Sequence, residues 1–332
     1  MLTAFLTHNP EDLEAYYGRA LPQLQAVAGV AFNPLDRDLN TAELIDAAAG
    51  CDVIIAHRST PGDAALFTAL PDLLAFLRCA VDISTIDVAA ASAAGVLVAH
   101  ADKSFVASTA ELALALMLDL ARNVSESTIG YRSGAQPPQR PGRQLRGRTA
   151  GIIGYGAIGS NLAGLLRGMG MHVVVCDPVV DSATDGFTQV TFHELLACSE
   201  FVLPLAPANP DTANLIDAVA LAAMRPGTFL INVSRGELLD ERAVAAALDS
   251  GQLGGLAMDV GMAADQRPSP ELAERPGVVA TPHLGGLTPE NADAQALSSV
   301  EQVQAIVAGE LPPRTVNPDD ARRLHTRSTR HR

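Results

Sequence analysis

A glycine-rich segment followed by a single carboxylate has the clearest chemistry in the sequence. Gly154, Gly156 and Gly159 form a G-x-G-x-x-G set after a short apolar run, and Asp177 ends the next apolar run. Glycines at these positions permit a tight turn, let backbone N–H groups approach a pyrophosphate and allow a helix to pack closely on its strand. An acid at the position of Asp177 accepts hydrogen bonds from a ribose and repels a 2′-phosphate. The pattern therefore predicts a site for NAD rather than NADP.

The elements expected around this segment are a strand, a helix and a second strand. The residues before Gly154 predict the first strand, 157–169 the helix and 171–176 the second strand. Ala157 and Ile158 open the helix, whose positive N-terminus favours an anion, and they join the predicted cofactor site. Further strands are expected over 201–204, 228–233, 256–260 and 278–281, and further helices over 217–223 and 241–250. This alternation predicts a parallel sheet covered on both faces, with ligands at the carboxyl ends of its strands.

Three polar residues stand at or just past the ends of these strands. They are Arg235, Asp259 and His283. Each has an ordinary alternative: a surface ion pair for Arg235, a cap or turn for Asp259, and a hydrogen-bonded loop position for His283. A structural role explains any one of these residues alone, but it explains less well why all three stand at strand ends of one dinucleotide-binding domain. We therefore treat them as candidate site residues.

The N-terminal region has the pattern of a second, smaller α/β unit. Strands are expected over 2–6, 53–56 and 74–79, and helices over 10–28, 41–49 and 61–70. An apolar pattern over 104–123 predicts a long helix that is buried between domains or between subunits. One further helix is expected over 289–309. The tail ARRLHTRSTRHR is basic, polar and aperiodic, which favours disorder over a binding arm.

Composition excludes several functional classes. The 332 residues allow two domains of ordinary size, no apolar run reaches the length of a membrane span, and the first residues lack the features of a signal peptide. A net charge of −14 argues against nucleic acids and anionic membranes as partners, because both require a basic face. The four cysteines show neither metal-ligand spacing nor pairing, which indicates buried free thiols in a reducing cytoplasm and predicts no metal site.

Five ordered motifs resemble those of the D-isomer-specific 2-hydroxyacid dehydrogenase family. They are GIIGYGAIG with Asp177, PANPDTANLI, INVSRGELLDE, LAMDV and TPHLGG, and the phosphoglycerate dehydrogenase and hydroxypyruvate reductase branches are the most similar. The resemblance implies two doubly wound parallel-sheet domains, with a Rossmann NAD domain inserted into a flavodoxin-like substrate domain. The expected boundaries are 1–100 and 286–318 for the substrate domain, 101–285 for the NAD domain and 319–332 for a disordered tail. The resemblance and the apolar long helix also imply a homodimer.

The resemblance assigns roles to the strand-end residues. In such enzymes a hydride passes between the nicotinamide and C2 of a small anionic 2-hydroxy or 2-keto acid. Arg235 would bind the substrate carboxylate as a bidentate donor, and His283 would act as general acid and base. Asp259 would accept a hydrogen bond from the nicotinamide carboxamide. The other implied contacts to the cofactor are Pro207, Val233 and Ser234.

The sequence departs from the family pattern beside the predicted histidine. The glutamate that pairs with the histidine in the family is replaced by Ala264, and Asp265 is the only nearby carboxylate. Asp265 either supports His283 after a one-residue shift of the loop or is a solvated loop acid. Without support from Asp265, His283 is expected to be a weaker base.

A second departure lies in the predicted substrate domain. Residues 80–87 replace a glycine-rich family motif and place Val81 and Asp82 where the family binds the substrate carboxylate. A carboxylate there repels an anion, which favours an unusual substrate. Arg58 matches an arginine of the phosphoglycerate branch and is either a substrate ligand or a surface residue. These departures leave two alternatives open: a catalytically weak NAD(H)-binding sensor or scaffold, and an enzyme for another small oxyanion such as formate or phosphite.

Overall fold

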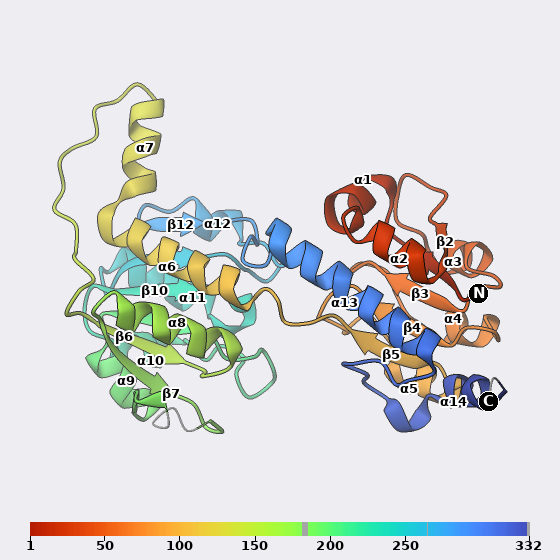
Figure 1. The fold of residues 1–332 in the computed structure, drawn as a ribbon. Coiled ribbons are helices and arrows are strands. Elements are labelled where there is room, and N and C mark those ends of the chain that lie inside the picture. Colours follow the sequence, from red (N-terminus) through yellow and green to blue (C-terminus); the bar gives the residue numbers. More distant parts are fainter. Residues whose placement is uncertain (181–184, 264, 331–332) are drawn as a thin grey trace. The chain divides into compact units, whose positions relative to one another are not determined.

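The chain forms two compact units (Figure 1). The computed structural model describes residues 1–180, 185–263 and 265–330. Unit 1 contains Met1–Ser104 and Pro289–Arg332, and unit 2 contains Phe105–Thr288. The chain therefore passes between the units after residues 104 and 288, where the sequence predicts crossings after 100 and 285.

Unit 1 is built on a five-stranded parallel sheet with the order β2-β1-β3-β4-β5. Its strands are β1 (Thr3–Leu6), β2 (Gly29–Phe32), β3 (Val53–Ala56), β4 (Ala75–Arg78) and β5 (Leu97–His100). This is the flavodoxin-like order, and its topological switch point lies between β1 and β3. The sequence predicts β1, β3 and β4 but misses β2 and β5, which form the two edges of the sheet.

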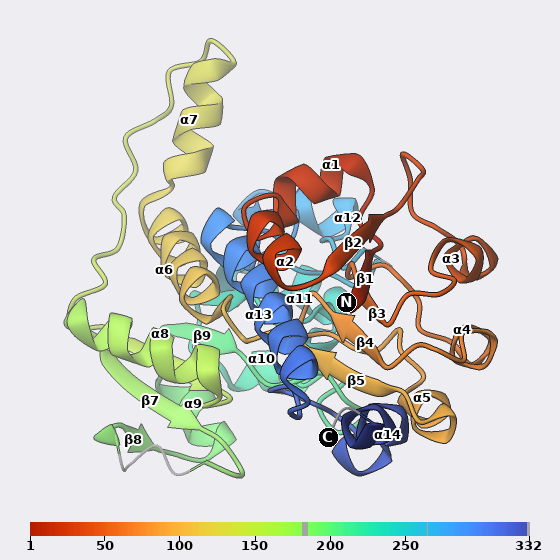
Figure 2. The ribbon, with the colours of Figure 1, turned by 45° about the vertical axis from the view of Figure 1, so that its right-hand side comes forward.

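Alternate residues of these strands face two apolar cores. Ala4, Leu6 and Ile55 pack with α2 (Leu21–Val27), α13 (Pro289–Ala308) and α14 (Arg322–Arg330). Phe5, Ile54 and the residues of the other face pack with α3 (Thr41–Ala47), α4 (Ala64–Ala69) and α5 (Val88–Ala94), which lie along one side of the sheet in Figure 2. Both faces are thus covered, as a doubly wound sheet requires.

Two predictions for unit 1 are wrong in detail. The single helix expected over 10–28 is divided into α1 (Pro10–Asp12), a π-helical turn (Leu13–Tyr17) and α2, because Pro22 lacks an N–H and starts a new helix. The expected disordered tail 319–332 instead contains α14 in its described part. Leu324 is buried, and the guanidinium of Arg323 donates to the carbonyl oxygens of Phe67, Leu70 and Leu73 near the end of α4.

Unit 2 is built on a seven-stranded parallel sheet with the order β12-β11-β10-β9-β6-β7-β8. Its strands are β6 (Thr149–Ile153), β7 (His172–Cys176), β8 (Thr188–Gln189), β9 (Phe201–Pro204), β10 (Thr228–Asn232), β11 (Leu253–Met258) and β12 (Val278–Ala280). The order is that of a Rossmann sheet extended by one strand, and its switch point lies between β6 and β9. The expected fold class, two doubly wound parallel sheets, is confirmed.

The helices of unit 2 cover both faces of this sheet. They are α6 (Val106–Arg122), α7 (Val124–Arg132), α8 (Ala157–Gly168), α9 (Phe192–Cys198), α10 (Ala218–Ala223), α11 (Glu241–Asp249) and α12 (Pro270–Ala273). The buried face of α6 packs against α8 and the sheet. In contrast, α7 projects away from the body of unit 2, and an extended segment returns from its end (Figure 1).

Two further predictions concern the whole chain. All four cysteines are free, but only Cys51 and Cys79 are buried, so the prediction of buried thiols is wrong for the exposed Cys198. Among the helices of the described residues, none combines the length and apolarity needed to cross a membrane.

Candidate active site

The turn after β6 has the geometry that its glycines predict. Gly154 has a φ of +101°, and a Cβ there would lie 2.8 Å from the backbone nitrogen of Ala206. A Cβ on Gly159 would lie 2.2 Å from the carbonyl oxygen of Gly154. Around the Cβ position of Gly156, however, there is no atom of the described residues within 4 Å. Two glycines are therefore required for packing, and the third leaves one side of the turn open to a bound group.

The first turn of α8 is suited to an anion. Gly156 is its N-cap, and no side chain within the described residues caps this end. Ala157 and Ile158 therefore contribute first-turn N–H groups that have no partner inside the helix and that carry the positive end of its dipole. A pyrophosphate fits such a helix end, and the open space at Gly156 allows its approach.

Asp177 is oriented by backbone N–H groups at the end of β7. One carboxylate oxygen accepts from Tyr155 N at 2.7 Å, and the other accepts from Val179 N and Val180 N at 2.8 Å each. Burial raises the pKa of Asp177, but the three hydrogen bonds lower it, and the net pKa lies below its ordinary value. The carboxylate is therefore ionised at neutral pH. Through Tyr155 it also holds the glycine-rich turn, a role that the sequence does not reveal.

Hydrogen bonds connect the carboxyl ends of β9, β10 and β11. The hydroxyl of Ser234 donates to the carbonyl oxygen of Ala206 at 2.9 Å, and the amide side chain of Asn232 donates to the carbonyl oxygen of Arg235 at 2.7 Å. The backbone nitrogen of Asp259 donates to the carbonyl oxygen of Asn232 at 2.9 Å. Asn232 is fully buried and was missed by sequence reasoning. The sequence feature that could have identified Asn232 is a polar residue at the end of an otherwise apolar strand.

Arg235 is half-buried beside this network. One of its guanidinium nitrogens donates to the carbonyl oxygen of Ser234 at 2.8 Å. None of the ion pairs formed by the described residues includes Arg235, so the surface ion pair considered from the sequence is not found there. The remaining guanidinium donors suit a carboxylate ligand. Of the other predicted cofactor contacts, Val233 is buried and Pro207 is exposed in the loop after β9.

Asp259 fixes the loop that carries His283. Its carboxylate is fully buried and accepts from the hydroxyl of Thr281 at 2.6 Å, from Leu284 N at 2.7 Å and from Gly285 N at 2.8 Å. Between these donors, His283 has a φ of +62°, a left-handed conformation that is uncommon outside glycine. Such a backbone costs about 1–3 kcal/mol and persists only where its surroundings hold it. The contacts of Asp259 supply that restraint.

The described contacts of Asp265 are with a neighbouring arginine. One carboxylate oxygen accepts from Arg267 N at 3.2 Å, and the other lies 3.3 Å from Arg267 Nε. Both side chains are exposed. Ala264, which replaces the family's glutamate, lies outside the described residues. The support of His283 by Asp265 therefore stays a prediction.

The candidates of unit 1 lie at the carboxyl edge of its sheet. Arg58 is exposed just after β3. Val81 is half-buried and Asp82 is exposed after β4, and a carboxylate oxygen of Asp82 accepts from Ser84 N at 2.8 Å. Because β3 and β4 are adjacent and parallel, the two loops begin at neighbouring strand ends.

Arg78, which sequence reasoning also missed, joins these two loops. It ends β4, is fully buried and donates to the carbonyl oxygens of His57 and Thr60 and to the hydroxyl of Thr85. Burial lowers the pKa of Arg78 to about 10, so the group is still charged at neutral pH. The sequence feature that could have identified Arg78 is a single arginine at the end of an apolar strand. Arg78 therefore restrains the loops that carry Arg58 and Asp82.

Comparisons with known proteins agree with this architecture. Residues 114–285 match the family described as "D-isomer specific 2-hydroxyacid dehydrogenase, NAD binding domain". The D-3-phosphoglycerate dehydrogenase of Mycobacterium leprae (strain TN) is 37% identical over 281 residues, which are 83% of this chain and 53% of that protein. This chain thus spans about half the length of the curated relatives it matches.

Solved structures resemble most of the chain. A protein from Thermus thermophilus has a TM-score of 0.84 and 29% identity, with 95% of this chain and 100% of that one covered. The pyruvate reductase of Chlamydomonas reinhardtii has a TM-score of 0.80 and 26% identity, with 94% and 98% covered. The chain belongs to the D-isomer-specific 2-hydroxyacid dehydrogenase family, and its unit 2 contains the NAD-binding domain of that family.

Proposed function

We propose that this protein is an NAD-dependent oxidoreductase that transfers a hydride between nicotinamide and C2 of a small D-2-hydroxy or 2-keto acid. One observation carries the proposal: the buried carboxylate of Asp259 holds His283 in a left-handed turn, at strand ends of the same sheet as Arg235. A histidine that only packs in a loop has no need of such a restraint. A general acid and base does, because proton transfer requires a fixed orientation.

The residues divide the reaction between them. Bound NAD would supply or accept the hydride. Arg235 would hold the substrate carboxylate through the guanidinium donors that do not bond to the carbonyl oxygen of Ser234. His283 would donate a proton to the keto oxygen during reduction and take it from the hydroxyl during oxidation. Arg58 and Val81 are proposed to contact the rest of the substrate, and Asp82 would disfavour a second anionic group there.

Replacing His283 with Ala tests the proposed activity. NADH oxidation is measured across a panel of 2-keto acids that includes hydroxypyruvate, glyoxylate, 3-phosphohydroxypyruvate and 2-oxoglutarate. At least one acid is expected to be reduced, and His283→Ala is expected to lower kcat by about 10²- to 10⁴-fold, because proton transfer then depends on water. NADH affinity, measured by calorimetry, should change little. If the native protein binds NADH but oxidises it with none of these acids, the proposal is contradicted.

A second candidate function is an NAD(H)-binding sensor with little catalysis. The observation in its favour is the pairing of Asp265 with Arg267, which engages the carboxylate that would otherwise support His283. The half-buried Arg235, which has no ion-pair partner among the described residues, argues against it, because a sensor does not require a carboxylate-binding arginine. The same panel separates the two functions, since a sensor binds NADH without turnover.

Replacing Asp177 tests the cofactor preference. Asp177→Ala is expected to narrow the ratio of NADPH to NADH dissociation constants by about tenfold, because the repulsion of a 2′-phosphate is removed. Asp177→Asn is the matched variant: it loses the charge but keeps one acceptor oxygen for the backbone donors of this turn, with its NH₂ group facing the others, so NADH affinity should fall less than in Asp177→Ala. Fluorescence titration with both nucleotides gives the ratios. An unchanged ratio in both variants would place the selection elsewhere.

We also propose that unit 2 pairs with a second copy of the chain through α7. Val124, Ile129 and Tyr131 on this projecting helix are 54%, 62% and 69% exposed, which is unusual for apolar side chains of one short helix. The double variant Ile129→Asp, Tyr131→Asp is expected to be monomeric by light scattering during gel filtration. Val219→Asp, at a 76% exposed valine on α10, is the control and should keep the native mass. A dimer in all three proteins would exclude α7 as the interface.

A further inference from the structure

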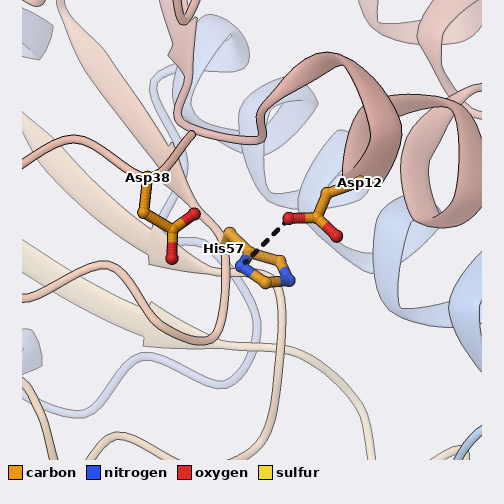
Figure 3. Close-up of side chains that lie close together, drawn as sticks. All are labelled: Asp12, Asp38 and His57. Carbon is orange, nitrogen blue, oxygen red and sulfur yellow. Dashed lines mark ion pairs between the residues drawn. The ribbon is translucent and has the colours of Figure 1, made fainter. Parts of the chain in front are cut away.

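We propose that unit 1 has a binding site for a divalent transition-metal ion of the Zn²⁺ or Co²⁺ type, with Asp12, Asp38 and His57 as its ligands (Figure 3). The proposal does not depend on the hydride-transfer function. The site could not be predicted from the sequence, because the three residues are far apart along the chain and follow no metal-binding motif.

The three side chains already converge. One potential ligand atom from each lies within 4.8 Å of the others, and the Nδ1 atom of His57 is 4.0 Å from a carboxylate oxygen of Asp12. Figure 3 shows the carboxylates of Asp12 and Asp38 on either side of the ring edge that carries Nδ1. A tetrahedral ion with bonds of about 2.0–2.2 Å holds adjacent ligand atoms roughly 3.4 Å apart. Movements of about an ångström would therefore complete the site, and Asp38 can make one because its side chain is exposed.

The position in the fold is one where ligands bind. Asp12 ends α1 after β1, Asp38 lies in the loop after β2, and His57 follows β3 directly. All three thus lie at the carboxyl edge of the sheet. The switch point between β1 and β3 is also there, and in doubly wound sheets the crevice at that point holds the ligand.

Neither carboxylate is paired with a lysine or an arginine in the described part of the chain. Within the described residues, the ion pairs formed by Asp12 and Asp38 include only the contact of Asp12 with His57. By contrast, the nearby Glu43 is paired with Arg37 at 2.7 Å. Two neighbouring carboxylates repel each other, and a divalent cation between them removes that repulsion. Burial lowers the pKa of His57, and the positive charges of Arg58 and Arg78 lower it further. The guanidinium of Arg78 does not pair with the carboxylates, because it donates to the carbonyl oxygens of His57 and Thr60.

A buried polar atom beside the cluster is an independent observation. His8 follows β1, is 2% exposed and packs edge-on against His57, with ring centroids 5.0 Å apart. Its Nδ1 is buried and has no hydrogen-bond partner in the described part of the chain. Such atoms are uncommon in native structures, and a bound ion or its coordinated water is one of the arrangements that satisfies them. A water bound to the proposed metal would provide the missing hydrogen-bond partner, because a water can both donate and accept.

The ligand set selects the class of ion. Ca²⁺ and Mg²⁺ prefer oxygen ligands alone, whereas an imidazole with two carboxylates suits Zn²⁺, Co²⁺ or Mn²⁺. Zn²⁺ is the ion for calorimetry, and Co²⁺ reports the coordination through its visible absorption. The hydroxyl of Ser59, 2.9 Å from His57 Nδ1, would give way to the ion when it binds.

The experiment uses the untagged protein of 332 residues after removal of metals with a chelator. We expect one Zn²⁺ ion per chain by calorimetry, a visible Co²⁺ spectrum and a rise in Tm with either ion. Asp38→Asn and His57→Gln should each weaken binding by at least about tenfold, since loss of outer-shell partners alone costs about 10- to 100-fold. His57→Gln should also change the Co²⁺ spectrum.

Asp36→Asn is the matched control. Asp36 is an exposed acid in the same loop as Asp38, so the substitution removes the same charge without removing a ligand. It should bind Zn²⁺ as the native protein does. The proposal is overturned by an absence of saturable binding, by equal weakening in Asp36→Asn and Asp38→Asn, or by unchanged affinity and spectrum in His57→Gln. Because Asp38 is exposed, its variant is expected to fold normally and gives a valid result.

Discussion

Replacing Arg235 with Ala is expected to lower kcat/KM for the preferred 2-keto acid by about a thousandfold, equivalent to roughly 4 kcal/mol of transition-state binding. The loss follows from the structure, where one guanidinium nitrogen is held by the carbonyl oxygen of Ser234 and the other donors are left for a substrate. A charged, bidentate contact to a carboxylate is among the strongest that a side chain makes. Steady-state kinetics with NADH as the varied and then the fixed substrate measure the effect.

Two further variants accompany Arg235→Ala. One tests whether the guanidinium geometry of Arg235 matters beyond its charge, and the other is a control at a different arginine. Arg235→Lys keeps the charge but loses the planar fork, and it should recover only part of the rate. Arg148→Ala removes an exposed arginine at the amino end of β6, opposite the carboxyl ends that carry the site, and should leave kcat/KM within about twofold, because exposed ion pairs contribute little. NADH affinity should stay near native in all three. If Arg235→Ala loses NADH binding to the same extent as activity, the arginine acts on the cofactor and the assigned role is wrong.

The sheet of unit 2 could be predicted from the sequence because its local signals agree with its fold. The glycines at 154 and 159 occupy places where a Cβ has no room, and six of the seven strands are mainly apolar runs bounded by turn residues. The exception is β8 (Thr188–Gln189), which is short, polar and exposed, and the sequence pattern missed it. Arg235, Asp259 and His283 were recognisable as candidates because parallel strands carry their ligand sites at carboxyl ends. The local sequence pattern was sufficient for these strands and residues, because both the strands and the positions of their ends are set by residues that are close together in the sequence.

What the sequence could not show are contacts set by the order of the strands. The donors to Asp259 come from beyond the following strand, and Asp12, Asp38 and His57 meet only because β1, β2 and β3 are neighbours. Helix α14 was missed for a similar reason. Its basic sequence has no apolar stripe, and it is anchored by one buried leucine and one arginine on the carbonyl groups near α4.

Replacing Asp259 with Asn is expected to lower both stability and kcat. The buried carboxylate accepts hydrogen bonds from Thr281, Leu284 and Gly285, whereas an amide offers one oxygen and places an NH₂ group against a donor. The free energy of unfolding should fall by about 2–4 kcal/mol, measured by urea denaturation. With its restraint weakened, His283 should leave the left-handed turn, and kcat should fall by about a hundredfold.

The pattern of kinetic change distinguishes positioning from general instability. Because Arg235 binds the substrate independently, KM for the 2-keto acid should change little while kcat falls. Thr281→Val is the matched control: it removes one donor and keeps the carboxylate with its two backbone donors, so its effect on kcat should be several-fold smaller. If Asp259→Asn loses stability but retains native kcat below its unfolding temperature, the turn at His283 does not depend on Asp259. In that case the bonds of Asp259 serve the fold alone, and the orientation of His283 arises elsewhere.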